Sequence, residues 1–141
     1  MTGWLGGRRD GGSVSVFFVV AAVAMLTMLG LVVDGGGKIR AVQRADAAAA
    51  EAARQGGQAI VVAPAVQGQG VQVDAAEAAA AARAYLAQAG VEGSVTVAQG
   101  TTLVVETNMS YSPVFLGLIG VGPMSVHGGA TVRLARGPNG G

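Results

Sequence analysis

The sequence contains no cysteine and a single histidine, and these absences exclude several kinds of functional site. Without cysteine there is no disulfide framework and no thiolate metal site. The four aspartates and four glutamates are scattered, and no two show the spacing of a catalytic or metal-binding pair. By strand alternation, His127 faces the polar side of its strand. We therefore expect a protein that is not an enzyme, with no catalytic residues, no metal site and no cofactor.

Charged and aromatic residues are also scarce. Only 12% of the residues are charged and the net charge is +1, so there is no basic face for a nucleic acid. Apolar residues make up 51% of the chain but aromatic residues only 4%, so a soluble core would be thin. The glycine-rich "GGG" and "GQG" runs lack the lysine and the strand-to-helix context of a phosphate loop. The sequence predicts neither a nucleic-acid partner nor a small-molecule substrate.

The chain does have a long apolar run, residues 14–33, without a single charge. Twenty helical residues span about 30 Å, the thickness of a bilayer's hydrocarbon core. A buried helix of a soluble domain would show a polar face, and this run shows none. A cleaved signal peptide has a shorter apolar region of about 7–15 residues. In addition, Asp34 follows the run where small residues of a cleavage site should stand. The pattern favours a retained signal anchor, a single transmembrane helix over 14–33 after a short basic leader, 1–13.

The charges beside the run leave its orientation open. Arg8 and Arg9 precede it, whereas Lys38, Arg40 and Arg44 follow it closely. Counted literally, the positive-inside rule does not favour a cytoplasmic N-terminus.

Beyond the run, residues 34–63 are predicted to continue the long helix as an amphipathic segment. Apolar and small residues recur there at helical spacing, at Ile39, Val42, Ala45, Ala49, Ala52, Gly56 and Ile60. Three consecutive glycines, Gly35, Gly36 and Gly37, weaken a helix and predict a hinge at the membrane interface. Pro64 is expected to end the element.

Residues 64–135 are predicted to form a small exported α/β domain. A second helix begins after Asp74, an N-cap with Glu77 three residues on, and ends at Gly90. About three antiparallel strands follow, with one apolar face packed on a helix. That face carries Val95, Val97, Leu103, Val105, Met109, Tyr111, Val126, Ala130, Val132 and Leu134. The expected class is α+β, a long N-terminal helix with a second helix on a small antiparallel sheet. The tail, 136–141, should be disordered.

An apolar segment, 114–124, separates the last two expected strands and is too short and glycine-interrupted to span a bilayer. Two interpretations stay open for it. It is either a core-capping or membrane-proximal loop, or an exposed contact patch for another subunit.

The apolar helix and the following "VVDGGGKIRAVQRADAAAAEAARQGGQAI" resemble the TadE/TadG-like proteins of tight-adherence (Flp, type IVb-like) pilus assembly, of an actinobacterial type. The resemblance is strongest from Gly11 to about Ile60. It implies a pilin-like architecture, a cytoplasmic N-terminus and an exported C-terminal domain. It also implies a role as a minor pilin or pseudopilin in the cytoplasmic membrane. The implied partners are membrane lipid, other pilin-like subunits and an assembly platform.

The resemblance also places a possible leader-cleavage site between Gly12 and Ser13. The family pattern often carries a glutamate five residues into the mature chain, and Phe17 stands at that position here. Two alternatives remain for the whole chain. One is a generic signal-anchored envelope protein whose exported domain binds an unrelated partner. The other is a secreted domain from which the apolar stretch is removed.

Overall fold

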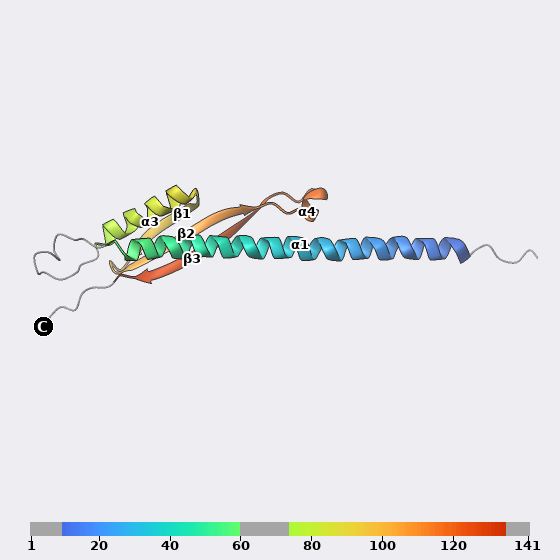
Figure 1. The fold of residues 1–141 in the computed structure, drawn as a ribbon, viewed down its shortest axis with the longest axis horizontal. Coiled ribbons are helices and arrows are strands. Elements are labelled where there is room, and N and C mark those ends of the chain that lie inside the picture. Colours follow the sequence, from blue (N-terminus) through green and yellow to red (C-terminus); the bar gives the residue numbers. More distant parts are fainter. Residues whose placement is uncertain (1–9, 60–73, 135–141) are drawn as a thin grey trace, which may run out of the picture.

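The computed structural model describes residues 10–59 and 74–134, which form an α+β fold (Figure 1). The elements are α1 (Asp10–Gly57), α3 (Ala75–Ala89), β1 (Glu92–Ala98), β2 (Thr102–Tyr111), α4 (Phe115–Leu118) and β3 (Met124–Arg133). The predicted class, a long helix with a second helix on three antiparallel strands, is confirmed. Residues 10–13 of the predicted leader belong to α1, whereas the rest of the leader, Pro64 and the tail fall outside the described residues.

Helix α1 is a continuous element of 48 residues, about 72 Å long at the standard helical rise. Its C-terminal half lies beside the strands and α3, and its N-terminal half extends freely past α4 (Figure 1). Of its most apolar stretch only 6% is buried within the protein. This exposure excludes the buried helix of a soluble core, because such a helix covers its apolar residues. By length, composition and exposure, this half of α1 is a candidate membrane span.

The end of α1 differs from the prediction, because the helix stops at Gly57 rather than at residue 63. Gly56 and Gly57 are consecutive, and each lowers helix stability by about 1 kcal/mol relative to alanine. The amide of Gln58 still donates to the carbonyl of Arg54, at 3.1 Å, and the helix pattern then ends.

Helix α3 begins and ends at the predicted capping residues. The Asp74 carboxylate accepts a hydrogen bond from the backbone N–H of Ala76 at 2.7 Å. Gly90 adopts the left-handed conformation, with φ of 65°, and its N–H turns back to the last carbonyls of the helix. Glu77 lies in the first turn, where its charge is favourable to the helix dipole.

The three strands form one antiparallel sheet in the order β1-β2-β3. Val105 pairs with Val95 on one side and with Ala130 on the other, and Leu103 pairs likewise with Val97 and Val132. These pairs place the predicted apolar residues of all three strands on one face. His127 lies on the opposite, exposed face, as predicted.

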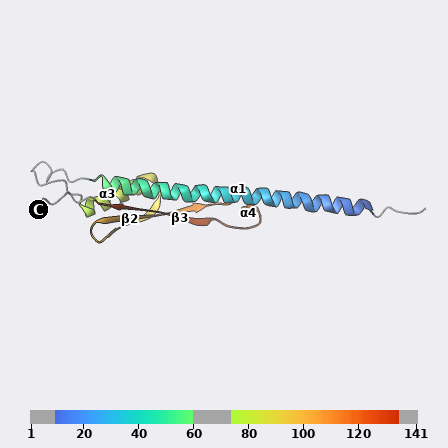
Figure 2. The same ribbon diagram turned by 90° about the horizontal axis from the view of Figure 1, so that it is seen from below.

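Both long helices cover the apolar face of the sheet, α1 over β2 and β3 and α3 over β1 (Figures 1 and 2). The core between them is made mainly of alanine, and its only large and fully buried side chains among the described residues are Leu103 and Val105. Alanine buries little area, but it allows two helices and a sheet to approach closely. The buried alanines are Ala45, Ala49, Ala52, Ala53, Ala78, Ala79 and Ala82.

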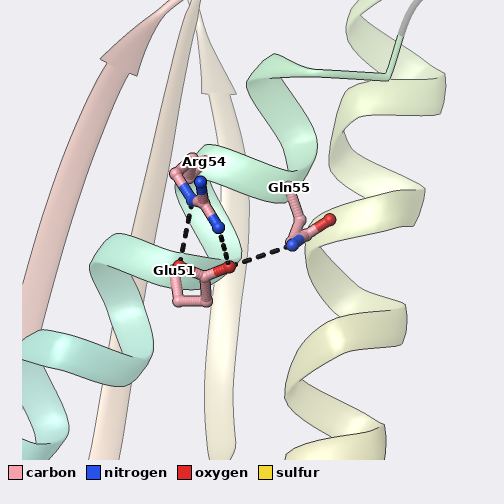
Figure 3. A network of polar contacts seen from close by, with 3 residues as sticks. All are labelled: Glu51, Arg54 and Gln55. Carbon is pink, nitrogen blue, oxygen red and sulfur yellow. Dashed lines mark hydrogen bonds and ion pairs between the residues drawn. The ribbon is translucent and has the colours of Figure 1, made fainter.

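Charged residues reappear on α1 only where it crosses the domain. Figure 3 shows Glu51 accepting hydrogen bonds from the Arg54 guanidinium, at 2.8 and 3.0 Å, and from the Gln55 amide, at 2.9 Å. The hydrogen bonds from Arg54 lower the pKa of the Glu51 carboxyl. The Arg54 side chain is 61% exposed, so the pair contributes little to stability. It marks this half of α1 as a segment that lies in water.

Candidate functional site: the junction of the apolar helix with the domain

A stripe of small residues along α1 forms the contact with the domain. Its spacing of three or four residues keeps it on one side of the helix. The stripe comprises Gly30, Asp34, Gly37, the half-buried Ala41, Ala45, Ala49, Ala52 and Gly56. Ile39, predicted to lie on the packed face, is instead 61% exposed. Two residues after Gly37, it points about 200° away from the stripe.

Asp34 occupies the centre of the junction, one residue beyond the apolar run, and its side chain is buried. Its Oδ1 accepts hydrogen bonds from the backbone N–H groups of Val114, at 2.7 Å, and Phe115, at 3.3 Å. The same oxygen accepts one from the Tyr111 hydroxyl at 3.4 Å, and Oδ2 accepts one from the N–H of Leu116 at 2.7 Å. One side chain of α1 therefore fixes the start of α4 and the end of β2.

The charge of Asp34 follows from these contacts. Burial alone would raise the pKa of the Asp34 carboxyl, but the hydrogen bonds from the backbone of Leu116, Val114 and Phe115 and from Tyr111 together lower it. The carboxylate is therefore ionised at neutral pH, and the donors replace the water that it has lost. The contact is fully present above the ordinary pKa of an aspartate and is lost as the pH falls through the lowered value.

Two glycines of α1 lie directly beneath the residues that Asp34 holds. A Cβ added at Gly30 would come within 3.0 Å of the Cβ of Phe115, and one added at Gly37 would overlap the Tyr111 hydroxyl. Nothing lies within 4 Å of such an atom at Gly35. The helix also passes through residues 35–37 without a break. Packing therefore requires glycine at position 37, while a hinge motion at 35–37 stays a prediction.

A second contact fixes α1 to β2 and β3 about three turns further along. The buried Thr107 hydroxyl donates to the carbonyl of Ala45 at 2.8 Å. The Asp46 carboxylate accepts from the N–H of Gly129 at 3.1 Å. Between these bonds Gly128 lies so close to α1 that any side chain there would overlap the backbone of Ala45. The two contacts together hold the domain in one register along the helix.

The other candidate residues lie apart from this junction. Gly12 and Ser13, the possible cleavage site, are exposed in the first turns of α1. His127 lines a shallow groove with Asp46 and Glu106. Within residues 10–59 and 74–134, no group of three histidine, aspartate or glutamate side chains is arranged to hold a metal ion.

Sequence reasoning missed the contact between Asp34 and the segment after β2. Each of the two contacting segments has a sequence feature that could have suggested the contact. A single acid ends a long apolar run, and residues 112–123 contain no charged residue. Neither feature, however, indicates the other across 80 residues of chain.

Residues 12–59 match the family model of Flp pilus-assembly TadE/G-like proteins (Tad). Over these residues the chain is similar to TadE/G-like proteins. The matched segment is α1 from Gly12 onward, so it contains the apolar run, Asp34 and the stripe of small residues. It comprises 48 of the 141 residues and does not include α3 or the sheet. Neither the curated proteins nor the solved structures yield a match.

The family and the helix agree on the coarse function. An exposed apolar helix long enough to cross a bilayer, matched over its length by a pilus-assembly family model, supports a membrane component associated with pilus assembly. The small-residue stripe and the Asp34 contact explain how such a chain carries a folded domain directly on its anchor, with no linker between them.

Proposed function

We propose that this TadE/G-like chain is a non-enzymatic minor pilin or pseudopilin-like subunit of a tight-adherence pilus or a related secretion system. The observation that supports this proposal is the continuity of α1. One unbroken helix joins an exposed apolar half to a half covered by a small sheet and a second helix. A subunit of this form is held in the bilayer before assembly, and its apolar half then has a surface for the helices of other subunits.

The proposed partners are membrane lipid, other pilin-like subunits and an assembly platform. In the apolar half of α1 large side chains are exposed on all sides, for example Phe17 at 68%, Met28 at 71% and Val32 at 72%. In water such a surface would aggregate. Lipid covers it in the membrane, and neighbouring apolar helices would cover it in an assembly.

The proposed orientation is a cytoplasmic N-terminus with the domain outside the cytoplasmic membrane. Similarity to the family supports it, since the flanking charges do not decide it. Protease added to intact, wall-stripped cells should digest a tag at the C-terminus and spare a tag at the N-terminus. A lysed sample, in which both tags are digested, controls for resistance of the tags themselves. The reverse pattern on intact cells would contradict the topology and the pilin assignment together.

The proposal of a minor subunit rests on Phe17. If the leader is cut after Gly12, the new amine of Ser13 lies among apolar helices in a fibre. A buried charge without a partner is costly, and Phe17 supplies no carboxylate. We therefore expect this chain at far below one copy per major subunit in purified sheared fibres, measured by quantitative mass spectrometry. The N-terminal peptide in the same digest reports whether the cut occurs. Recovery as the dominant fibre protein would overturn the minor role.

A further inference from the structure

The segment between β2 and β3 carries an exposed apolar tip, defined here as residues 114–121. Leu118 is 81% exposed and Ile119 is 77% exposed, the two most exposed large apolar side chains among the described residues. The segment 112–123 around the tip contains no charged residue. A patch of this kind on a folded domain marks a surface that is covered in use.

The position of the tip along α1 indicates what covers it. Phe115 packs on Gly30, and a groove of about 350 Å³ separates α1 from α4. The α1 side of this groove is lined by Val23, Leu26, Thr27, Gly30 and Leu31. These residues stand between two and ten positions before the end of the apolar run, or about 3 to 15 Å along the helix. One leaflet of bilayer hydrocarbon is about 15 Å thick. The tip is therefore level with the leaflet next to the domain.

The membrane-spanning segment has no freedom to shift and leave the tip in water. The run 14–33 matches the hydrocarbon thickness with no residue to spare, and Arg8, Arg9 and Asp10 precede it. A shift toward the N-terminus by the two to three turns needed would draw these three charges into the hydrocarbon.

We propose that the tip inserts into the membrane leaflet adjoining the domain, where lipid acyl chains fill the groove between α1 and α4. The continuity of the tip with the anchoring half of α1 favours lipid over a second copy of the chain. Lipid is present wherever α1 is embedded, whether or not the subunit has assembled. The inference goes beyond the proposed function and requires only that the apolar half of α1 lies in a bilayer.

At least six of the eight backbone amides of the tip have a partner within the protein, as a lipid environment demands. Hydrocarbon offers no hydrogen-bond partners, so each amide placed there must be satisfied within the protein. Asp34 accepts from the first three amides of the tip. The amides of Ile119 and Val121 donate to the carbonyl of Leu116, at 3.2 and 3.0 Å, and that of Gly120 donates to Gly117 at 3.2 Å. Asp34 thus both fixes the tip and satisfies the amides that insertion would otherwise leave without water.

Insertion would give the domain a second point of attachment. A domain held by one helix alone can tilt and rotate above the bilayer, whereas a helix and an adjacent tip fix its orientation. Leaving the membrane for an assembly would then require withdrawal of the tip as well as of α1.

The absence of native cysteine allows a direct test with single cysteines in the full chain. Three variants, Leu118→Cys, Leu29→Cys and Thr131→Cys, place an environment-sensitive fluorophore at the tip, in the anchor and on the exposed face of the sheet. Each is reconstituted into phosphatidylcholine vesicles. We expect the labels at Leu118 and Leu29 to be blue-shifted and quenched by lipids with spin-labelled acyl chains. The label at Thr131 should be quenched by iodide only. All three replaced side chains are exposed, so the substitutions should not impair folding.

Each other outcome overturns the inference in a distinguishable way. A Leu118 label quenched by iodide but not by spin-labelled lipid, beside a lipid-quenched Leu29 label, would reject insertion of the tip and leave the anchor intact. A Leu118 label shielded from both quenchers, with self-quenching that rises with the protein-to-lipid ratio, would assign the groove to a second copy. A Leu29 label in water would reject the anchor itself.

Discussion

Replacing Gly128 with alanine is expected to lower the free energy of unfolding of the domain by about 3 kcal/mol or more, because the new methyl group has no space. A Cβ at this position would overlap the carbonyl carbon of Ala45 and the amide nitrogen of Asp46. Both are backbone atoms of α1, and no rotamer change can move them. The helix would have to rise from β3, which would also break the hydrogen bond from Thr107 to Ala45.

The neighbouring glycine supplies a matched control. A Cβ at Gly129 would meet nothing closer than the carbonyl oxygen of Val105, at 3.9 Å. Gly129→Ala therefore changes strand propensity by the same amount without the overlap, and its backbone N–H still donates to Asp46. Urea unfolding of the full chain in detergent micelles, followed by circular dichroism, should show a large fall in midpoint for Gly128→Ala only. Equal midpoints for the two variants would mean that α1 does not pack on β3 as described.

Features that depend on neighbouring residues were predictable from the sequence. The length of the apolar run, the capping residues Asp74 and Gly90, and the alternation along β2 and β3 all act within a few residues. Each of these is present in the structure. The class of the fold follows from them, because strands with one apolar face and helices with small residues have few ways to cover each other.

The register of α1 against the sheet was not predictable, and the reason lies in its composition. Alanine and glycine occupy almost every side of the helix between residues 45 and 57, so hydrophobic periodicity hardly distinguishes one face from another. Ile39, which helical spacing alone groups with the packed residues, is exposed. The face is selected instead by steric fit, since Gly37, Gly56 and Gly128 are positions where another element comes too close for a side chain.

The role of Asp34 was hidden for a different reason. An acid at the end of an apolar run indicates the start of the aqueous segment, where its side chain is expected to be exposed to solvent. Here the carboxylate oxygens of Asp34 accept hydrogen bonds from backbone N–H groups about 80 residues further along the chain. Only the folded arrangement brings the uncharged segment after β2 to the same level of the helix, so no local pattern could indicate the pairing.

The second large effect on stability is expected from substitutions in the glycines at 35–37. If these glycines serve packing, Gly35→Ala and Gly37→Ala should differ in stability, whereas a hinge predicts that the two behave alike. Gly35→Ala places a methyl group in open space and should stabilise α1 by about 1 kcal/mol through helix propensity. Gly37→Ala brings the same gain in propensity, but its methyl group would overlap the Tyr111 hydroxyl and come within 2.8 Å of ring carbon Cε2. We expect a net loss of about 1–3 kcal/mol in the unfolding free energy for Gly37→Ala.

A compensating change distinguishes this overlap from any general damage to the helix. Shortening the opposing side chain, as Tyr111→Leu, removes the ring tip that the new methyl group would meet. The double variant with Gly37→Ala should therefore unfold at a higher urea concentration than Gly37→Ala alone. If the glycines act instead as a hinge, Gly35→Ala and Gly37→Ala should impair pilus assembly equally and leave the stability of the domain unchanged. Measuring both assembly and unfolding for the two single variants separates these results. Equal behaviour of the pair would reject the close packing of Tyr111 on α1, because only position 37 lies beneath that ring.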